Sequence, residues 1–365
     1  MKLLVQPDDG IHALVKGIAE ASKTIEIMIF RFDQKEIEQA LGNAVTRGVS
    51  VHALIAHTNR AGEENLRKLE LRLLASGVTV ARTADDLVRY HAKLMLIDGR
   101  ELYLLAFNWT HLDAERSRSF GLIIRNPTLV KEVARLFEDD VQRRPYEPGC
   151  ENLVVSPVNA RRLLSDYLKD AKKSLTIYDP KISDSAMIGL LAERARAGVD
   201  IKVIGRMTRG IPGVEVRKSA IRLHTRTMVR DGNFVFVGSQ SLRALELDAR
   251  REVGIIVRHP KIAARLSQIF ADDWALAEQA AVQTQDEVPA AKVAKRVAKI
   301  VTRELPDVAT VLNGAVKEIV GNAIDVELNP DEVEAVVKGA VKEAVKEVVS
   351  DMLQEAVGEE GRSGQ

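Results

Sequence analysis

The sequence predicts an α/β protein built from two related modules and followed by a helical extension. Three observations carry this prediction: an internal repeat, an alternation of short apolar runs with amphipathic stretches, and a change of composition near residue 281. The predicted boundaries are 1–148 for module one, 149–280 for module two and 281–365 for the extension.

The internal repeat relates the two modules. The stretch "YHAKLMLIDG" matches "LHTRTMVRDG", with His91 at the position of His224, and the offset of 133 holds as far as Asp140 and Asp273. Upstream the offset is 150, so module one has 17 additional residues around "GEENLRKLELRLLASG". The leucine spacing of this segment predicts a surface helix that module two lacks.

Strands and helices are expected to alternate within each module. The segments "KEIEQALGNAVTRG" and "MIGLLAERARAG" have helical periodicity, and each ends at a glycine suited to a helix C-cap. Short apolar runs precede and follow them, which predicts a sheet covered by helices. The segment 143–149, with two prolines and a glycine, is the predicted linker between the modules.

The extension differs from the rest of the chain in composition and charge. It has 10 basic and 16 acidic residues, whereas residues 1–280 have 43 basic and 36 acidic ones. The valines from Val333 to Val348 form one stripe against a Lys/Glu face, which predicts an amphipathic helix. This helix is expected to pack on the body or on its copy in a homo-oligomer. Peripheral membrane contact is the alternative, which the alternating Lys and Glu disfavour.

Several protein classes are excluded by composition. The single cysteine, Cys150, cannot form an intramolecular disulfide framework or a cysteine-based zinc cluster. No Asp, Glu and His cluster has metal-ligand spacing, so no metal or other cofactor is expected. The first ten residues, "MKLLVQPDDG", contain no apolar stretch long enough for a signal peptide, which predicts a cytoplasmic protein. The basic excess of residues 1–280 indicates an anionic partner.

The repeated motif places polar side chains on one face of a strand. His91 and Lys93 are two residues apart and therefore share a face. The pairs Asp98-Gly99 and Asp231-Gly232 predict two-residue hairpin turns, in which both aspartates have a structural role. With this turn Lys93 faces residue 104, and the returning strands bring Asn108 near His91 and Ser239 with Ser241 near His224.

The two clusters together suit cleavage of a phosphodiester. Modules related by an internal pseudo-twofold would pool two imidazoles and two cations at their boundary. Lys93 and Arg226 can neutralise the non-bridging oxygens of the phosphate. One imidazole can attack phosphorus while the other protonates the leaving oxygen, and histidine suits both tasks because its ordinary pKa is ~6.5.

The motif resembles that of the phospholipase D superfamily. The pattern His-x-Lys-x4-Asp-x6-Gly-Ser-x-Asn occurs twice within residues 1–280, at one constant offset. The resemblance implies two α/β sandwich modules with mixed sheets, which share one site at their interface. It also implies a phosphohistidine intermediate, with His91 and His224 as nucleophile and general acid, His91 being the expected nucleophile. Phosphate would be held by Lys93, Asn108, Arg226, Ser239 and Ser241.

The carboxylates of the motif are incomplete. Glu252, 28 residues beyond His224, matches the family's carboxylate that orients a histidine. Its counterpart in module one is Ser119, and the nearby Glu115 could replace it if the loop is shifted. Motif one also reads Leu-Ala-Phe-Asn where Gly-Ser-x-Asn is expected, at residues 105–108. Motif two has Arg226 for lysine and Ser241 for asparagine.

The sequence leaves three functions open. The first is a metal-independent phosphodiesterase that hydrolyses a phospholipid or transfers its phosphatidyl group. The second is a nuclease that uses the same site on DNA or RNA, which the mild charge and the 4% aromatic content disfavour. The third is a decayed relative that binds phosphate without turnover.

Overall fold

The computed structural model describes residues 1–57 and 63–286. The chain divides into two compact units, Met1–Glu278 and Gln279–Gln365. The predicted helix around Val333–Val348 lies outside the described residues, and so does the remainder of the extension beyond Asp286. Helix α9, Pro260–Asp286, begins in the first unit and continues past its end at Glu278.

Module one is built on a mixed sheet. Its strand order is β1-β8-β7-β6-β2-β3-β4, with β2, β3 and β4 parallel to one another and the other neighbours antiparallel. The strands have the following bounds: β1 Lys2–Gln6, β2 Thr24–Ile29, β3 Ser50–Ile55, β4 Thr79–Arg82, β6 Leu94–Ile97, β7 Glu101–Leu105 and β8 Ser117–Ile124.

Module two repeats this sheet. Its order is β12-β11-β10-β14-β15-β17-β9, which is the order of module one read from the other end. The predicted α/β fold of two related modules with mixed sheets is therefore confirmed. The strands have the following bounds: β9 Leu153–Val155, β10 Ser174–Ile182, β11 Asp200–Met207, β12 Val214–Arg217, β14 Arg226–Arg230, β15 Phe234–Gly238 and β17 Val253–Arg258.

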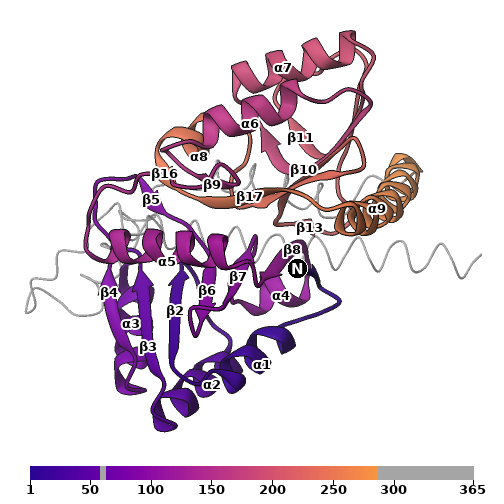
Figure 1. Ribbon diagram of the computed structural model, residues 1–365. Helices are drawn as coiled ribbons and strands as arrows, with labels where there is room; N and C mark the ends of the chain where they lie inside the picture. Colours follow the sequence, from indigo (N-terminus) through magenta and orange to yellow (C-terminus); the bar gives the residue numbers. More distant parts are fainter. Residues whose placement is uncertain (58–62, 287–365) are drawn as a thin grey trace, which may run out of the picture. The chain divides into compact units, whose positions relative to one another are not determined.

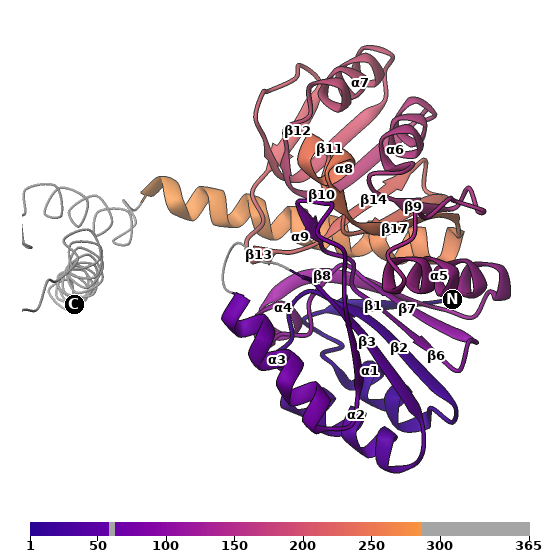
Figure 2. The ribbon, with the colours of Figure 1, turned by 90° about the vertical axis from the view of Figure 1, so that its left-hand side faces the viewer.

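Helices cover both faces of each sheet. In module one these are α1 His12–Glu20, α2 Lys35–Thr46, α3 Glu63–Ala75, α4 His111–Glu115 and α5 Pro127–Val141. In module two they are α6 Ala160–Lys169, α7 Ser185–Arg196, α8 Ala244–Asp248 and α9 Pro260–Asp286. Figures 1 and 2 show α5 and α9 between the two sheets, with α1 and α2 on the far side of one sheet and α6 and α7 on the far side of the other.

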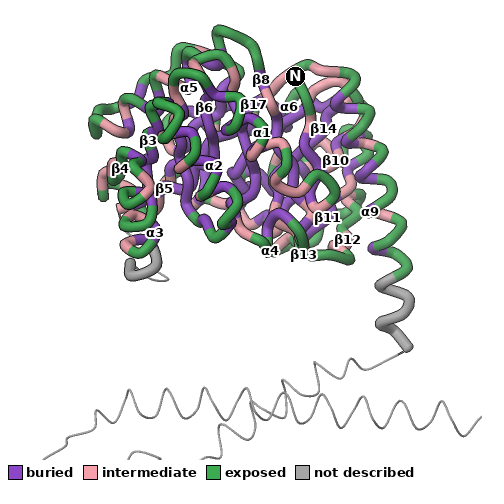
Figure 3. Tube along the Cα trace, turned by 90° about the horizontal axis from the view of Figure 1, so that it is seen from below, coloured by how far each residue is buried: buried purple, intermediate pink, exposed green. Residues whose placement is uncertain are grey.

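The hydrophobic core follows these layers. One cluster joins α5 and α9 to the inner faces of both sheets, through residues such as Leu136, Phe120 and Phe270. A separate cluster lies under α1 and α2, and another under α6 and α7. Buried residues concentrate on the strands and exposed ones on the turns and outer helix faces (Figure 3). The shared inner cluster fixes the two sheets against each other and with them the two repeated motifs.

The predicted helices form, and module two lacks the additional one. The two amphipathic stretches become α2 and α7, and Gly48 and Gly198 follow them with φ of 86° and 87°, a conformation that glycine adopts without strain. Helix α3 occupies the extra segment of module one, whereas β11 leads to β12 without a helix. The linker segment lies between α5 and β9, and the boundary at 148 stays a prediction.

The predicted two-residue turns are wrong. Ile97 pairs with Glu101 and Arg230 with Phe234, so each loop has three residues. Both Asp98 and Gly99 have positive φ, 52° and 59°, and one further residue completes the turn before pairing resumes. The register is therefore shifted by one residue, and Lys93 faces Leu105 instead of residue 104, as the 2.9 Å bond from the Leu105 amide to the Lys93 carbonyl shows.

Two short strand pairs join the modules symmetrically. β13, Arg222–Leu223 of module two, pairs in parallel with Ser117–Arg118 of β8, and β16, Arg250–Arg251, pairs in parallel with β5, Arg89–Tyr90 of module one. These pairs are exchanged by the offset of 133. The predicted pseudo-twofold is thus present in the backbone.

Two ion pairs follow the same symmetry. Arg118 binds Asp273 through two nitrogens at 2.8 and 2.9 Å, and Arg251 binds Asp140 at 2.9 Å. In each case an arginine of one module reaches an aspartate at the inner helix of the other. The repeated aspartates of the sequence therefore hold the modules together.

No helix in the described part of the chain is long and apolar enough to cross a membrane.

Candidate active site

Each repeated histidine is positioned by the opposite module. His91 follows β5, and its backbone amide donates to the Arg251 carbonyl at 2.8 Å. His224 follows β13, and its amide donates to the Arg118 carbonyl at 3.0 Å. The short strand pairs between the modules therefore bring both motifs to one boundary.

His91 is held by a carboxylate of module two. Its Nδ1 lies 2.9 and 3.0 Å from the two oxygens of Glu252, which is fully buried. Phe30 packs edge-on against the imidazole, with the ring centres 4.8 Å apart. Because Nδ1 is occupied by Glu252, the lone pair of a neutral His91 lies on Nε2. Glu252 has the place that the sequence predicts for an orienting carboxylate.

His224 has a weaker partner. Its Nδ1 lies 3.4 Å from Asp113 Oδ2 and makes no hydrogen bond within the described residues. The Ser119 hydroxyl, at the position that matches Glu252, donates to the His224 carbonyl at 2.8 Å. The expected replacement Glu115 instead binds His111 at 2.7 Å, because it lies on the exposed side of α4. The suggestion that Glu115 supplies the missing carboxylate is therefore wrong, and Asp113 lies there instead.

Asp113 and Glu246 form a second symmetric pair that sequence reasoning missed. Asp113 accepts from the backbone and side-chain nitrogens of Asn108 at 3.0 and 2.6 Å. Glu246 accepts from the Ser241 amide at 2.7 Å. Both carboxylates are buried, and the offset of 133 relates them. The same offset relates Glu115 to Asp248, so the repeat alone does not tell the buried pair from the exposed one.

The two motif cations are buried at the boundary. Lys93 donates to the His91 carbonyl at 2.7 Å, and burial lowers its pKa to about 7. The nearest carboxylate to Arg226 is Glu246, 3.8 Å from Nη2. Arg226 Nε and Nη1 have no hydrogen-bond partner within the described residues, although the side chain is 90% buried. Buried donors without partners cost free energy, which a bound anion would recover.

The predicted small polar residues differ in whether their hydrogen-bonding atoms are free to bind a substrate. Asn108 leaves Oδ1 without a partner in the described part of the chain, while its nitrogen is held by Asp113. Ser239 exchanges hydrogen bonds with the backbone of Val253 at 3.2 and 3.4 Å. The hydroxyl of Ser241 donates to Asp179 at 2.5 Å and is thus committed within the protein.

Asp98 and Asp231 lie at the turns, away from this cluster. Asp98 accepts from the backbone amides of residues 22–24, and Asp231 accepts from those of residues 172–174. Each carboxylate therefore ties its hairpin to the start of the neighbouring strand.

The electrostatics of the site favour an anion. Burial lowers the pKa of His91 well below its usual value, and Lys93 and Arg226 lower it further. Burial also lowers the pKa of His224. The positive charges of Arg226 and, across the module boundary, Lys93 lower it further. The four groups thus share one electrostatic environment, in which an added cation is disfavoured. A phosphate bound among them would relieve this repulsion and raise the pKa of both histidines.

The protein covers most of both imidazoles. The side chains of His91 and His224 keep exposed fractions of 8% and 14%. A reacting group must therefore enter at a small part of each imidazole.

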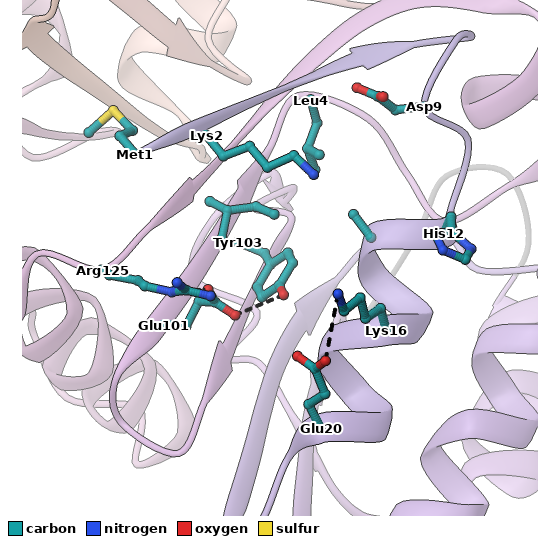
Figure 4. A pocket seen from close by; sticks show the side chains of 12 residues that line it. Met1, Lys2, Leu4, Asp9, His12, Lys16, Glu20, Glu101, Tyr103 and Arg125 are labelled. Carbon is teal, nitrogen blue, oxygen red and sulfur yellow. Dashed lines mark hydrogen bonds and ion pairs between the residues drawn. The ribbon is translucent and has the colours of Figure 1, made fainter.

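A separate cavity of about 500 Å³ lies at the edge of module one, and no motif residue lines it. Figure 4 shows its charged side chains, with Lys2, Lys16 and Arg125 set against Asp9, Glu20 and Glu101. Lys16 lies 3.7 Å from Glu20, and Arg125 lies 2.6 Å from Glu101. Because its charges are matched internally, this cavity has no evident preference for an anion. Within residues 1–57 and 63–286, no three His, Cys, Asp or Glu side chains are arranged to hold a metal ion.

A comparison with protein families identifies the fold and motif. The model of the PLD-like domain of cardiolipin synthase matches residues 14–141 and 206–274, which include both histidines. The chain belongs to this phospholipase D-like family. The resemblance inferred from the two motifs is thereby confirmed.

Curated relatives of the family differ in their named activities. The mitochondrial cardiolipin hydrolase of Danio rerio is 27% identical over 124 residues, which are 34% of this chain and 53% of the hydrolase. The polyphosphate kinase of Pseudomonas putida is 24% identical over 302 residues, which are 73% of this chain and 41% of the kinase. The chain thus spans about half the length, or less, of these relatives.

Solved structures share the fold. Polyphosphate kinase of Porphyromonas gingivalis has a TM-score of 0.63 and 20% identity, covering 74% of this chain and 49% of the kinase. Phosphatidylserine synthase of Haemophilus influenzae has a TM-score of 0.59 and 12% identity, covering 76% of this chain and 86% of the synthase. These likenesses extend over both modules.

Proposed function

We propose that the protein cleaves or transfers a phosphodiester through a phosphohistidine intermediate at the boundary of its two modules. The observation that carries the proposal is the pooled cluster of His91, His224, Lys93 and Arg226, in which buried guanidinium donors of Arg226 have no partner among the described residues. A phosphate fits this cluster because it brings negative charge and acceptor oxygens to the same place.

The first step forms the covalent intermediate. Nε2 of neutral His91 attacks phosphorus, and the bond from phosphorus to the leaving oxygen breaks. His224, protonated once the anionic substrate is bound, transfers its proton to that oxygen. Glu252 stabilises the positive charge that develops on the His91 ring, as a buried carboxylate at Nδ1 can. Lys93 and Arg226 bind the non-bridging oxygens.

The second step releases the product. Neutral His224 accepts a proton from water or from an acceptor alcohol, whose oxygen attacks phosphorus from the side that the leaving group vacated. The bond from phosphorus to His91 Nε2 breaks, and both histidines return to their starting states. Whether water or an alcohol is the acceptor decides between hydrolysis and transfer.

The retained carboxylates support catalysis over mere phosphate binding. A decayed site needs cations but has no need of an acid beside each imidazole. Here His91 has Glu252, and His224 has Asp113 in place of the carboxylate that motif one lost at Ser119. Each histidine therefore keeps a group that can orient it.

A phosphatidyl group is the substrate that we favour, because the matching family model is that of cardiolipin synthase. A phosphoanhydride such as polyphosphate is the second candidate. The alignment with the polyphosphate kinase of Pseudomonas putida favours it, since it spans 73% of this chain. A nuclease remains less favoured, because residues 1–280 have a mild basic excess and the chain has few aromatic residues. The cytoplasm is the proposed location.

One assay series separates these functions. The protein, in excess EDTA, is incubated with bis(p-nitrophenyl) phosphate, phosphatidylcholine vesicles, phosphatidylglycerol vesicles, single-stranded DNA and polyphosphate. His91→Ala is compared with His12→Ala, an exposed histidine of α1 outside the site. We expect phospholipid turnover that His12→Ala keeps and His91→Ala loses. Turnover of DNA or polyphosphate alone would show that the substrate is not a phospholipid. No turnover of any of these substrates would overturn the proposal.

A further inference from the structure

A second cavity next to the candidate active site has an unbalanced charge. Its volume is about 410 Å³, and it lies between the ends of β10 and β11 and the segment that leads into β13. Three of its lining residues are cations, Arg206, Lys218 and Arg222, and none is acidic. A concave surface lined by one sign of charge concentrates the potential and attracts the opposite charge.

Two of these cations have no partner in the described part of the chain. Arg206 and Lys218 are exposed and make no hydrogen bond or ion pair there. Arg222 uses only Nη1, which donates to Asp113 Oδ1 and to Ser117 Oγ at 2.5 Å each. The charges of Arg206 and Lys218 are therefore available to a ligand, unlike the ion-paired charges of the cavity at the edge of module one.

The cavity adjoins the half of the site that contains His224. Leu223 lines it and directly precedes His224 in the chain. Arg222 also lines it and binds Asp113, whose other oxygen lies 3.4 Å from His224 Nδ1. An anion in the cavity would thus lie on the His224 side of the bound phosphate.

Module one has no cation at the positions that match Lys218 and Arg206. Four residues before the equivalent arginines, Arg89 and Arg222, module one has Asp85 where module two has Lys218. At the end of the second parallel strand it has Ala56, a buried residue, where module two has the exposed Arg206. The pseudo-twofold is therefore broken in charge, which indicates a substrate whose two ends differ.

We propose that this cavity binds a second anionic group of the substrate, carried by the alcohol that leaves from the His224 side. The inference rests on the proposed function and deepens it, because it names the substrate class: a phosphodiester whose leaving alcohol is itself phosphorylated. The positive charge of a choline leaving group would be repelled by the cations that line the cavity.

Short-chain lipids that are monomeric in solution test the leaving group directly. Dihexanoyl phosphatidylglycerophosphate, phosphatidylglycerol and phosphatidylcholine share the retained end and differ only in the leaving alcohol. We expect kcat/KM to be at least tenfold higher for the glycerophosphate leaving group than for glycerol, and lowest for choline. Equal values for glycerophosphate and glycerol would overturn the inference, even though phosphodiester cleavage itself would stand.

Charge-reversal variants locate the effect. Arg206→Glu and Lys218→Glu should each reduce the preference for the phosphorylated leaving group at least fivefold, mainly through KM, and leave phosphatidylglycerol turnover unchanged. Lys261→Glu changes an exposed cation of α9 outside the cavity and is the matched control. It should leave kcat/KM unchanged for both lipids. A preference that survives both cavity variants would contradict the assignment.

A binding measurement keeps the inference testable if the chain has no lipid activity. Calorimetric titration of His91→Ala with sn-glycerol 3-phosphate should detect binding, and addition of Arg206→Glu or Lys218→Glu should abolish it. The dinucleotide TpT, with and without a terminal phosphate, distinguishes a nucleotide source of the anion from a lipid one. Absence of glycerol 3-phosphate binding, together with indifference to the terminal phosphate, would overturn the inference.

Discussion

The two histidines occupy equivalent places in the repeat but differ in their surroundings. His91 meets both oxygens of the fully buried Glu252, whereas His224 meets one oxygen of Asp113 at 3.4 Å without a hydrogen bond. Asp113 is also shared with Asn108 and Arg222. The comparison teaches that a duplicated site can keep its symmetry in the backbone while its two halves specialise. A firmly oriented ring suits a nucleophile, and a loosely held ring suits an acid that must change its protonation state.

Exchanging the leaving group should reveal the largest difference between the two histidines. His91→Ala is expected to lose at least about 10³-fold in kcat for every phosphodiester, since it removes the nucleophile. His224→Ala should lose about 10²–10⁴-fold with an alkyl leaving group. With p-nitrophenolate, which leaves without a proton, the first turnover of His224→Ala should slow less than about tenfold, although release from His91 is then slow because His224 no longer activates water. Steady-state kinetics with the alkyl ester and burst kinetics with the p-nitrophenyl ester measure this, and equal losses of the burst rate in His91→Ala and His224→Ala would contradict the assigned roles.

The symmetric ion pairs between the modules should also differ in strength. Asp273 accepts three hydrogen bonds, two from Arg118 and one from Tyr178, whereas Asp140 accepts one from Arg251 and has an oxygen without a partner in the described residues. Burial raises the pKa of Asp140 to about 6, which also weakens its pairing. Asp273→Ala should therefore cost about 3–5 kcal/mol of unfolding free energy and Asp140→Ala about 1–2 kcal/mol. Urea titrations compare them, and equal costs would show that the pairs are equivalent.

Isosteric changes of Glu252 and Asp113 test how strongly each carboxylate supports its histidine. Glu252→Gln should lower kcat about 10²-fold, because it removes the charge that orients and stabilises the His91 ring. Asp113→Asn should lower it about tenfold, since its contact with His224 is longer. Rate measurements with an alkyl phosphodiester test this, with unfolding temperatures as the control for folding. A larger loss in Asp113→Asn would reverse the assignment of nucleophile and acid.

The pH profile reports on the motif cations, which also differ between the modules. Burial lowers the pKa of Lys93 to about 7, so its ammonium is charged below pH 7 and becomes neutral above it. The matching position of module two has an arginine, Arg226, instead of a lysine. In the free enzyme kcat/KM should therefore fall severalfold above pH 7. Lys93→Arg should extend the plateau to higher pH, and an unchanged alkaline limb in this variant would assign the limb to another group.

Much of the fold and half of the site could be predicted from the sequence, because they depend on periodicity and on the repeat. The offset of 133 located both histidines and both cations, and the resemblance to the family indicated Glu252, whose contact with His91 crosses the modules. The register was wrong by one residue, because the spacing of Asp98-Gly99 does not reveal that a third residue joins the turn. Asp113 was missed because only the placement of α4 decides which of its carboxylates faces inward.

Trapping the covalent intermediate tests the central claim most directly. The His224→Ala variant is mixed with bis(p-nitrophenyl) phosphate and quenched at alkaline pH, where phosphohistidine survives, and its peptides are then analysed by mass spectrometry. We predict one modified residue, His91, bearing the phosphoryl ester, and no adduct in His91→Ala. An adduct on another residue, or turnover by His224→Ala with no adduct during the burst of p-nitrophenolate, would contradict a site in which His91 attacks phosphorus.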